Sequence, residues 1–377
     1  MKLKELLAVF ESYCPPSMSM KGDFCGLQIG RMDRDIQKVL FTLDVRPEVV
    51  QEAIDLGVDL IFAKHQPIFK PIQALTDQTA QSAMYLDLIQ HDIAVYVAHT
   101  NIDIVPDGLN DWFCERLALQ VTDFLSLTHA FNEQKLVVYV PQSHAEQLRI
   151  ALGAVGAGLQ GNYQATSFTS SGIGRFTPNE WANPTIGANN QAEAVEEERI
   201  EFLVKNTLMP TVLATLKQVH PYEEPAYDIF DLAPFSASSQ NYGIGRIGKL
   251  AQPETLADFC QRVKTVFGLE HLRVILPPKQ ADWQQAVQTV AICGGSGEKF
   301  YREALQKGAD VFITGDVYYH TAHDLQANQL ITLDPGHHIE VLFVEKLLEK
   351  FIDWQKQYHW EVDFLASKVD TNPFMTI

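Results

Sequence analysis

The sequence has few cysteines and few basic residues for its length. Only five of the 377 residues are cysteine, and no C-x-x-C pair occurs. This odd, scattered set argues against a disulfide framework or a structural zinc site, and it suits a reducing compartment. The chain has 29 basic and 47 acidic residues, a formal net charge of −18. It therefore lacks the basic composition that nucleic-acid binding requires, and we expect no nucleic-acid partner.

Membrane and secretion signals are also missing. No stretch approaches the roughly 18 consecutive apolar residues of a membrane-spanning helix. The first 14 residues have the pattern of an amphipathic helix, and Glu5 and Glu11 interrupt its apolar run. That interruption argues against a secretory signal peptide. We therefore expect a cytoplasmic protein with no membrane partner.

Short apolar runs alternate with helical patterns in the first and last thirds of the chain. Three runs in the first third are typical of buried strands: 39–45, 58–63 and 93–98. Residues 47–57 begin with Pro and end with Gly, which predicts a helix. The last third repeats this alternation. We predict that residues 1–127 and 235–377 together form one layered α/β core.

The middle third has a different order. Its strand and helix patterns follow one another as β-α-β-β-α-β, which is typical of ferredoxin-like domains. We therefore predict an inserted ferredoxin-like α+β domain over residues 128–234. Within it, HPYEEPAYD (220–228) concentrates polar and aromatic side chains. This segment either lines a second binding surface or forms a turn with packing tyrosines.

Polar side chains gather directly after five of the predicted strands. The clusters lie at 64–66, 99–103, 294–296, 315–316 and 334–338. In open α/β sheets, ligands bind outside the carboxyl ends of the strands, so we expect these clusters to converge on one cleft. GGSGE (294–298) either binds an anion at a helix N-terminus or forms a tight strand-to-helix turn.

Four of these polar residues are candidate metal ligands. His337 and Glu340 are three positions apart, so their side chains can point the same way from a helix that starts at residue 338. His65 and Asp103 offer one more nitrogen and one more oxygen. Imidazole and carboxylate donors without a thiolate suit zinc, manganese, iron or cobalt. Scattered polar loop residues would give the same pattern.

His320 and Asp316 are candidates for catalysis. His320 forms a bare H-x-x-H with His323, which is a weak metal signal. We interpret His320 as a cleft-wall residue or a proton-transfer group, which Asp316 would orient. Ser296 lacks the G-x-S-x-G frame, so a serine nucleophile is disfavoured.

Several stretches resemble a known family. They are DFCGLQIG (23–30), residues 42–70, YVAHTNID (96–103), GGSG (294–297), FITGDVYYH (312–320) and DPGHHIE (334–340). With them the chain resembles the type 2 homologues of GTP cyclohydrolase I, also called NGG-interacting-factor-like proteins with a dinuclear metal centre. HPYEEPAYD resembles the insert of the longer members. The resemblance implies a ring-shaped homohexamer with a nitrogen-regulator-like or CutA-like insert.

The resemblance also implies a two-metal site. Carried onto this chain, its ligands are His65, Asp103, His337 and a bridging Glu340, while Lys64 replaces an expected histidine. A protonated ammonium has no lone pair and repels a nearby dication. We therefore expect one divalent ion, zinc before manganese, iron or cobalt, with Lys64 as a surrogate cation. The alternative is that Lys64 swings out and waters complete a second ion's site.

Two functions remain open at this point. The first is a metal-dependent hydrolase that acts on a small molecule, GTP or another nucleotide or phosphoester, through metal-activated water. The second is a non-catalytic, metal- or ligand-responsive assembly protein. The replacement at Lys64 and the regulator-like insert favour the second.

Overall fold

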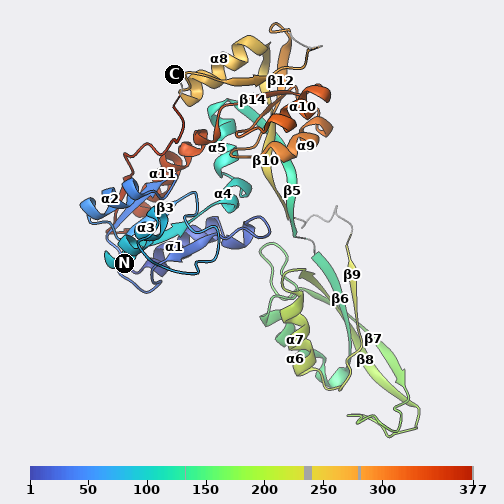
Figure 1. The fold of residues 1–377 in the computed structure, drawn as a ribbon. Helices are drawn as coiled ribbons and strands as arrows, with labels where there is room; N and C mark the ends of the chain where they lie inside the picture. Colours follow the sequence, from blue (N-terminus) through green and yellow to red (C-terminus); the bar gives the residue numbers. More distant parts are fainter. Residues whose placement is uncertain (132, 233–239, 279–281, 376–377) are drawn as a thin grey trace. The chain divides into compact units, whose positions relative to one another are not determined.

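The computed structural model describes residues 1–131, 133–232, 240–278 and 282–375 of a mixed α/β protein (Figure 1). The chain divides into two compact units. The core unit combines Met1–Thr128 with Tyr242–Ile377, and the inserted unit comprises His129–Asn241. The predicted end of the insert, residue 234, lies outside the described residues. No helix in the described ranges is long and apolar enough to cross a membrane.

The first sheet of the core unit has the strand order β1-β4-β3-β2-β15. These strands are β1 (Gly26–Ile29), β4 (Ala94–Val97), β3 (Leu60–Ala63), β2 (Lys38–Thr42) and β15 (Asp363–Ala366). Neighbours pair in parallel from β4 to β15, and β1 is antiparallel to β4. The sheet therefore joins the beginning of the chain to its end.

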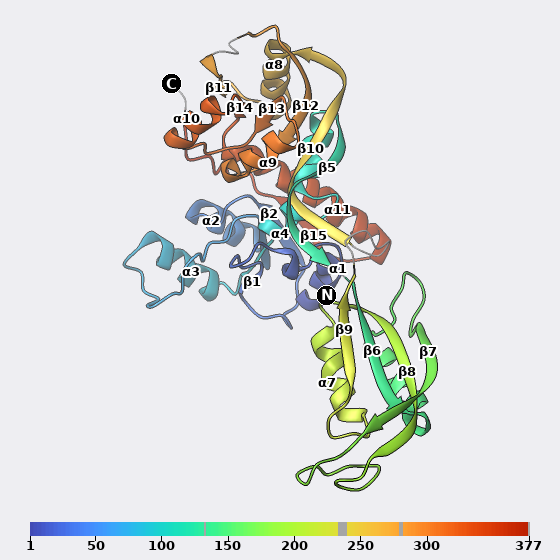
Figure 2. The same cartoon turned by 90° about the vertical axis from the view of Figure 1, so that its right-hand side faces the viewer.

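Helices cover both faces of this sheet (Figures 1 and 2). Apolar residues of α2 (Pro47–Leu56) and α3 (Ala80–Gln90) pack on one face against Leu40, Ile61 and Val95. On the other, rings of α1 (Leu3–Tyr13) and α11 (Leu342–Tyr358) meet rings of the strands, as in the Phe62–Phe351 pair at 5.4 Å. Helix α2 begins at Pro47 and ends before Gly57, whose φ of 63° closes it. The predicted helix over 47–57 is confirmed.

The second sheet has the order β11-β14-β13-β12-β10-β5. These strands are β11 (Arg273–Ile275), β14 (Ile331–Asp334), β13 (Val311–Ile313), β12 (Ala286–Ile292), β10 (Gln240–Thr255) and β5 (Leu119–Phe131). The helices that accompany it are α4 (Thr100–Ile104), α5 (Leu109–Arg116), α8 (Leu256–Phe267), α9 (Tyr301–Gln306) and α10 (Tyr319–Ala327). The inner strands β12, β13 and β14 are parallel.

The predicted single α/β layer is therefore wrong in one respect, because the core contains two sheets. The central strands of each sheet are parallel. The first sheet, built mainly from the N-terminal third, also contains β15 from the C-terminal third, and the second sheet, built mainly from the C-terminal third, also contains β5 from the N-terminal third. Strand partners 120 to 330 residues apart leave no trace in local patterns of apolar residues, so local patterns cannot divide the strands between two sheets.

A buried arginine fixes the end of the short helix α4. Arg246 on β10 donates through Nε and Nη2 to both carboxylate oxygens of Asp111, at 2.6 and 2.8 Å. Its remaining N–H groups reach the carbonyls of Gly243, Gly245, Ile104 and Val105. The last two carbonyls belong to the end of α4, where a cation is stabilising. This contact holds in place the helix that carries Asp103.

The inserted unit contains a four-stranded antiparallel sheet with two helices on one face. Its elements follow as β6 (Glu133–Pro141), α6 (Ala145–Ala154), β7 (Ser167–Phe176), β8 (Glu193–Lys205), α7 (Met209–Val219) and β9 (Tyr227–Asp231). The sheet order is β7-β8-β6-β9. Alternate residues of β6 and β8, such as Leu136 and Phe202, pack beneath the helices.

The HPYEEPAYD segment (220–228) forms a turn whose side chains are hydrogen-bonded to strands of this sheet. His220 is buried, donates from Nε2 to the carbonyl of Tyr139 at 2.9 Å, and accepts at Nδ1 from the Tyr222 amide. The Tyr222 hydroxyl donates to Glu197 at 2.9 Å. The Glu223 carboxylate accepts from the backbone of residue 183. These contacts favour the structural alternative, a turn with packing side chains.

Candidate metal centre

Three candidate ligands meet between the two sheets of the core unit. His65 follows β3 in the first sheet, whereas His337 and Glu340 follow β14 in the second. One donor atom from each lies within 4.8 Å of the other two. The expected convergence of polar residues after the strands therefore brings these three side chains together.

A 3-10 turn, η5 (His337–Val341), presents two of the ligands. The helix predicted from residue 338 instead begins as this turn, and α11 follows from Leu342. Side chains three residues apart eclipse each other in a 3-10 helix. His337 Nε2 therefore lies 3.2 Å from Glu340 Oε2. The tighter turn aligns the pair more closely than an α-helix would.

The three side chains point their donor atoms at one another. His65 Nε2 lies 2.8 Å from Glu340 Oε2 and 3.3 Å from His337 Nε2. Glu340 is fully buried, and the two imidazoles are partly buried. Two imidazole nitrogens and one carboxylate oxygen form a three-donor set typical of catalytic zinc sites, which leave one position open.

A second carboxylate orients each imidazole. The far nitrogen of His65, Nδ1, lies 2.7 Å from Asp44, and His337 Nδ1 lies 2.7 Å from Asp316. In metal sites such partners fix the tautomer and leave the other nitrogen for the ion. Asp316 therefore orients His337 rather than His320. Asp44 was missed from the sequence, although it follows β2 as His65 follows β3.

Lys64 and Asp103 lie on the other side of Glu340. The Lys64 ammonium donates to Glu340 Oε1 at 2.8 Å and to Asp103 Oδ2 at 3.2 Å. Lys64 is 2% exposed. The amide of Asn110 donates to the Asp103 carbonyl and accepts from the Gly294 N–H, which ties α4 to the glycine turn. Asp103 is thus bound to the ammonium and lies outside the three-donor set.

The charges of this cluster shift its pKa values. Burial alone would lower the pKa of Lys64, but the Asp103 and Glu340 carboxylates raise it above its ordinary value. Burial would raise the pKa of Glu340, yet Lys64 and the two histidines hold it well below its usual range. For Asp103, burial prevails and the pKa is raised. The Glu340 hydrogen bond raises the pKa of His337 to about 9.

The residues present fit one divalent cation. Glu340 is a buried carboxylate that turns Oε2 toward two imidazoles, and each imidazole has an acidic partner on its far side. Gly295 lies against this set, since a Cβ there would come within 2.9 Å of Glu340 Oε1 and 3.3 Å of His337 Nε2. Imidazole and carboxylate donors suit zinc, manganese, iron or cobalt.

The glycine turn at 294–298 has a structural role. The Gly297 N–H donates to the Thr314 hydroxyl at 2.9 Å, and the Gly295 carbonyl accepts from the Gly315 N–H. A Cβ on Gly297 would approach the Cys293 sulfur to 2.6 Å. With the N–H groups of Gly294 and Gly297 bound to protein atoms, this segment favours the tight-turn alternative over anion binding.

Two other histidines, His99 and His320, lie outside the three-donor set. His320 is exposed and stacks edge-on against Tyr319. His99 bonds to the Asp23 carboxylate at 2.9 Å, and its ring centroid lies 5.8 Å from that of His65. Asp23 gave no periodic signal in the sequence because it precedes β1 in a loop. The structure thus adds an Asp–His pair beside the ligands.

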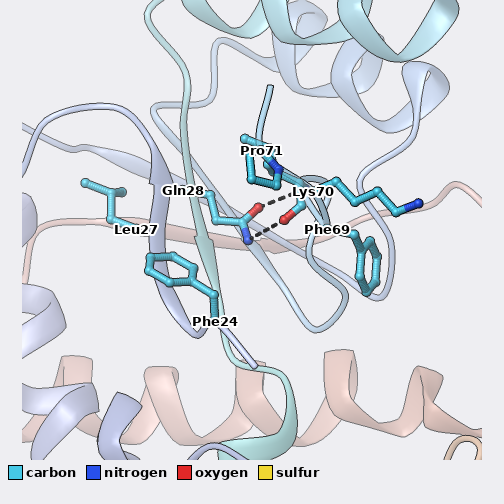
Figure 3. A pocket seen from close by; sticks show the side chains of 7 residues that line it. Phe24, Leu27, Gln28, Phe69, Lys70 and Pro71 are labelled. Atoms are coloured by element: carbon cyan, nitrogen blue, oxygen red, sulfur yellow. Dashed lines mark hydrogen bonds between the residues drawn. The ribbon is translucent and has the colours of Figure 1, made fainter. Parts of the chain in front are cut away.

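A hollow of about 230 Å³ lies beside this Asp–His pair. Figure 3 shows Gln28 between the rings of Phe24 and Phe69, with Lys70 extending beyond Phe69. The Gln28 amide binds both backbone groups of Ile68. The Phe69 ring lies 6.4 Å from the His99 ring. Both phenyl rings are more than half exposed, so a ligand can reach them.

The fold and the cluster together define a mixed α/β protein with a His-His-Glu group between two sheets that could hold a metal ion. The sequence profile of the Duf34/NIF3 (NGG1p interacting factor 3) family matches residues 1–373. The chain belongs to this family.

Relatives and solved structures agree with this assignment. The chain is 42% identical to a Listeria innocua protein over 373 residues, which are 98% of this chain and 97% of the relative. A Bacillus subtilis protein is 38% identical over 98% of this chain and 97% of its own length. Both are named GTP cyclohydrolase 1 type 2 homolog. A Bacillus cereus protein related to NIF3 superposes with a TM-score of 0.78 at 38% identity over 100% of this chain and 99% of its own. A Staphylococcus aureus protein superposes with a TM-score of 0.81 at 28% identity, over 100% of this chain and 99% of its own.

Proposed function

We propose that the protein is a metal-dependent hydrolase that acts on a nucleotide or a related phosphoester. The convergence of His65, His337 and Glu340 carries this proposal, because three protein donors leave coordination positions open. A divalent ion held there, zinc before manganese, iron or cobalt, would act as a Lewis acid and lower the pKa of a water molecule. The GTP-related name of the relatives supports a nucleotide substrate.

The hollow beside the Asp23–His99 pair is the proposed substrate site, because the His99 ring lies between Phe69 of the hollow and the ligand His65. The Phe24 and Phe69 rings offer flat faces on which a nucleobase can stack. The exposed Lys70 ammonium would attract a phosphate group. Asp316 keeps the His337 ring in place, and His320 is the candidate for proton transfer. The pH profile of a His320→Ala variant tests that role.

A turnover screen tests the proposed function. Purified chain loaded with zinc, manganese, iron or cobalt is incubated with GTP, other nucleotides and generic phosphoesters. We expect turnover that is lost in His337→Ala, and a raised KM in Phe69→Ala with little change in kcat. The absence of turnover with every metal and substrate would contradict a hydrolase.

The second candidate is a non-catalytic, metal- or ligand-responsive assembly protein. The buried Lys64 and the β-α-β-β-α-β order of the inserted unit favour it. We propose that this unit is a ferredoxin-like domain of the nitrogen-regulator or CutA kind, and that the protein is a cytoplasmic homohexamer. The exposed apolar side chains Ile72 and Leu75 support self-association. Light scattering with and without metal tests this assembly, and a monomer at micromolar concentration would refute it.

A further inference from the structure

Lys64 is the buried counter-charge of two carboxylates. Its side chain is 2% exposed, Glu340 is fully buried and Asp103 is 5% exposed. Two carboxylates so far from water require a cation close by. The ammonium meets that requirement with hydrogen bonds of 2.8 and 3.2 Å to the two side chains. Lys64 thus supplies a positive charge to both carboxylates from the chain itself.

Glu340 separates two positions for cations. Its Oε2 faces the imidazoles of His65 and His337, whereas its Oε1 faces Lys64. On the Oε2 side, both imidazoles can donate lone pairs to an ion. On the Oε1 side stands an ammonium, which has no lone pair and repels a dication. The two sides of one carboxylate therefore suit different cations.

We propose that the Lys64 ammonium is a permanent cation of the centre, which holds the Oε1 side of Glu340 and limits the centre to one divalent ion per chain. This inference rests on the metal centre of the proposed function. It concerns how many ions the centre holds, and it does not depend on which substrate is hydrolysed or on whether turnover occurs.

Asp103 has a carboxylate oxygen, Oδ1, that could bind a second ion. Among the described residues, no group donates to Asp103 Oδ1, although that atom is buried. In a Lys64→His variant, the new imidazole would join Asp103 and Glu340 as a second three-donor set. That variant should therefore hold two ions where the wild type holds one.

The test is elemental analysis of zinc per chain. Metal-free wild type, Lys64→His and Lys299→His are incubated with excess zinc and dialysed. Lys299 is an exposed lysine of the same unit, so its variant controls for zinc captured by an added histidine. We expect about one ion in the wild type and in Lys299→His, and about two in Lys64→His. Two retained ions in the wild type would overturn the proposal.

A cobalt titration of the wild type also measures the number of ions per chain, and it does not depend on the folding of any variant. The visible absorbance should stop rising at one equivalent, and a break at two equivalents would refute the inference. Failure to bind any divalent ion would remove the metal centre and this inference together. Bound metal at one equivalent without turnover would leave the inference intact and contradict only the hydrolase.

Discussion

Asp316 accepts a hydrogen bond from His337 Nδ1 at 2.7 Å while its own backbone has a φ of 54°. Left-handed backbone at a residue other than glycine is uncommon and concentrates at functional sites. Here the turn after β13 aims the carboxylate at a ligand of the centre. The left-handed backbone of Asp316 and its hydrogen bond to Nδ1 together hold the His337 imidazole in place.

We expect Asp316→Gly to weaken zinc binding about 10- to 100-fold, the usual effect of removing the carboxylate behind a ligand histidine. Glycine accepts the backbone without strain, so the loss would come from the missing carboxylate. Gln329→Gly is the matched control, because Gln329 has a φ of 59° and lies outside the centre. Competition with a chromophoric chelator measures both. Unchanged affinity in Asp316→Gly would contradict the positioning role.

The metal-free protein should lose stability as the pH rises. Glu340 raises the pKa of His337 from 6.5 to about 9. A raised pKa in the folded state means that the protonated form stabilises it fully below pH 6.5, and that this contribution is lost as the pH rises through 9. The pKa of His65 is also raised, so its deprotonation likewise lowers the stability of the folded state as the pH rises.

Urea unfolding of metal-free protein between pH 6 and 9.5 measures this loss. A His337→Gln variant should show a shallower decline over the same range. Zinc affinity should rise with pH up to about 9, since the ion displaces the protons on the imidazoles. An equally steep decline in stability for both proteins would assign the effect to other groups.

Gly295→Ala should impair zinc binding. Gly295 has a φ of 60°, and an added Cβ would lie 2.9 Å from Glu340 Oε1. Gly308→Ala is the control, because Gly308 has a φ of 71° with nothing within 4 Å of its Cβ position. Both variants should lose about 1–2 kcal/mol of stability from the strained backbone. Only Gly295→Ala should lose zinc affinity, by more than about tenfold or 1.4 kcal/mol, and equal zinc affinity in the two would refute the contact.

Removal of the inserted unit should leave the centre able to bind metal. All the candidate ligands lie in the core unit, and the Thr128 hydroxyl donates to the Tyr242 carbonyl at 3.2 Å where the two neighbouring strands β5 and β10 meet. A short Gly-Ser linker can therefore join residue 128 to residue 242. Zinc affinity should stay within roughly tenfold, about 1.4 kcal/mol. A much larger loss in a folded variant would show that the insert completes the site.

Much of the cluster could be predicted from the sequence because of one rule. Polar residues that follow parallel strands meet at the carboxyl edge of a sheet, and this rule brought His65 and His337 into one group. The three-residue spacing from His337 then added Glu340. The same rule, applied to β2, would have found Asp44. The place of Lys64 beside Asp103 and Glu340 was implied only by the family resemblance, in which Lys64 replaces an expected histidine.

Other features depend on pairings that no local pattern reveals. The crossing of β5 and β15 into the opposite sheets is decided by contacts between distant parts of the chain. The helix predicted from residue 338 begins instead as a 3-10 turn from His337, and the sequence does not separate the two because both place residues three apart on one side. The assignment of Asp316 to His337 instead of His320 depends on a turn whose backbone the sequence does not indicate.

The order in which the ribosome makes the ligands follows from the two-ended core. His65 and His337 are 272 residues apart, so at 5–20 residues per second the second imidazole is synthesised about 15–50 seconds after the first. Strand β15, which completes the first sheet, comes later still. A chain stalled or cleaved before residue 337 has one imidazole of the cluster and lacks Glu340. If the centre binds zinc as proposed, zinc retention would distinguish finished chains from those that end before residue 337.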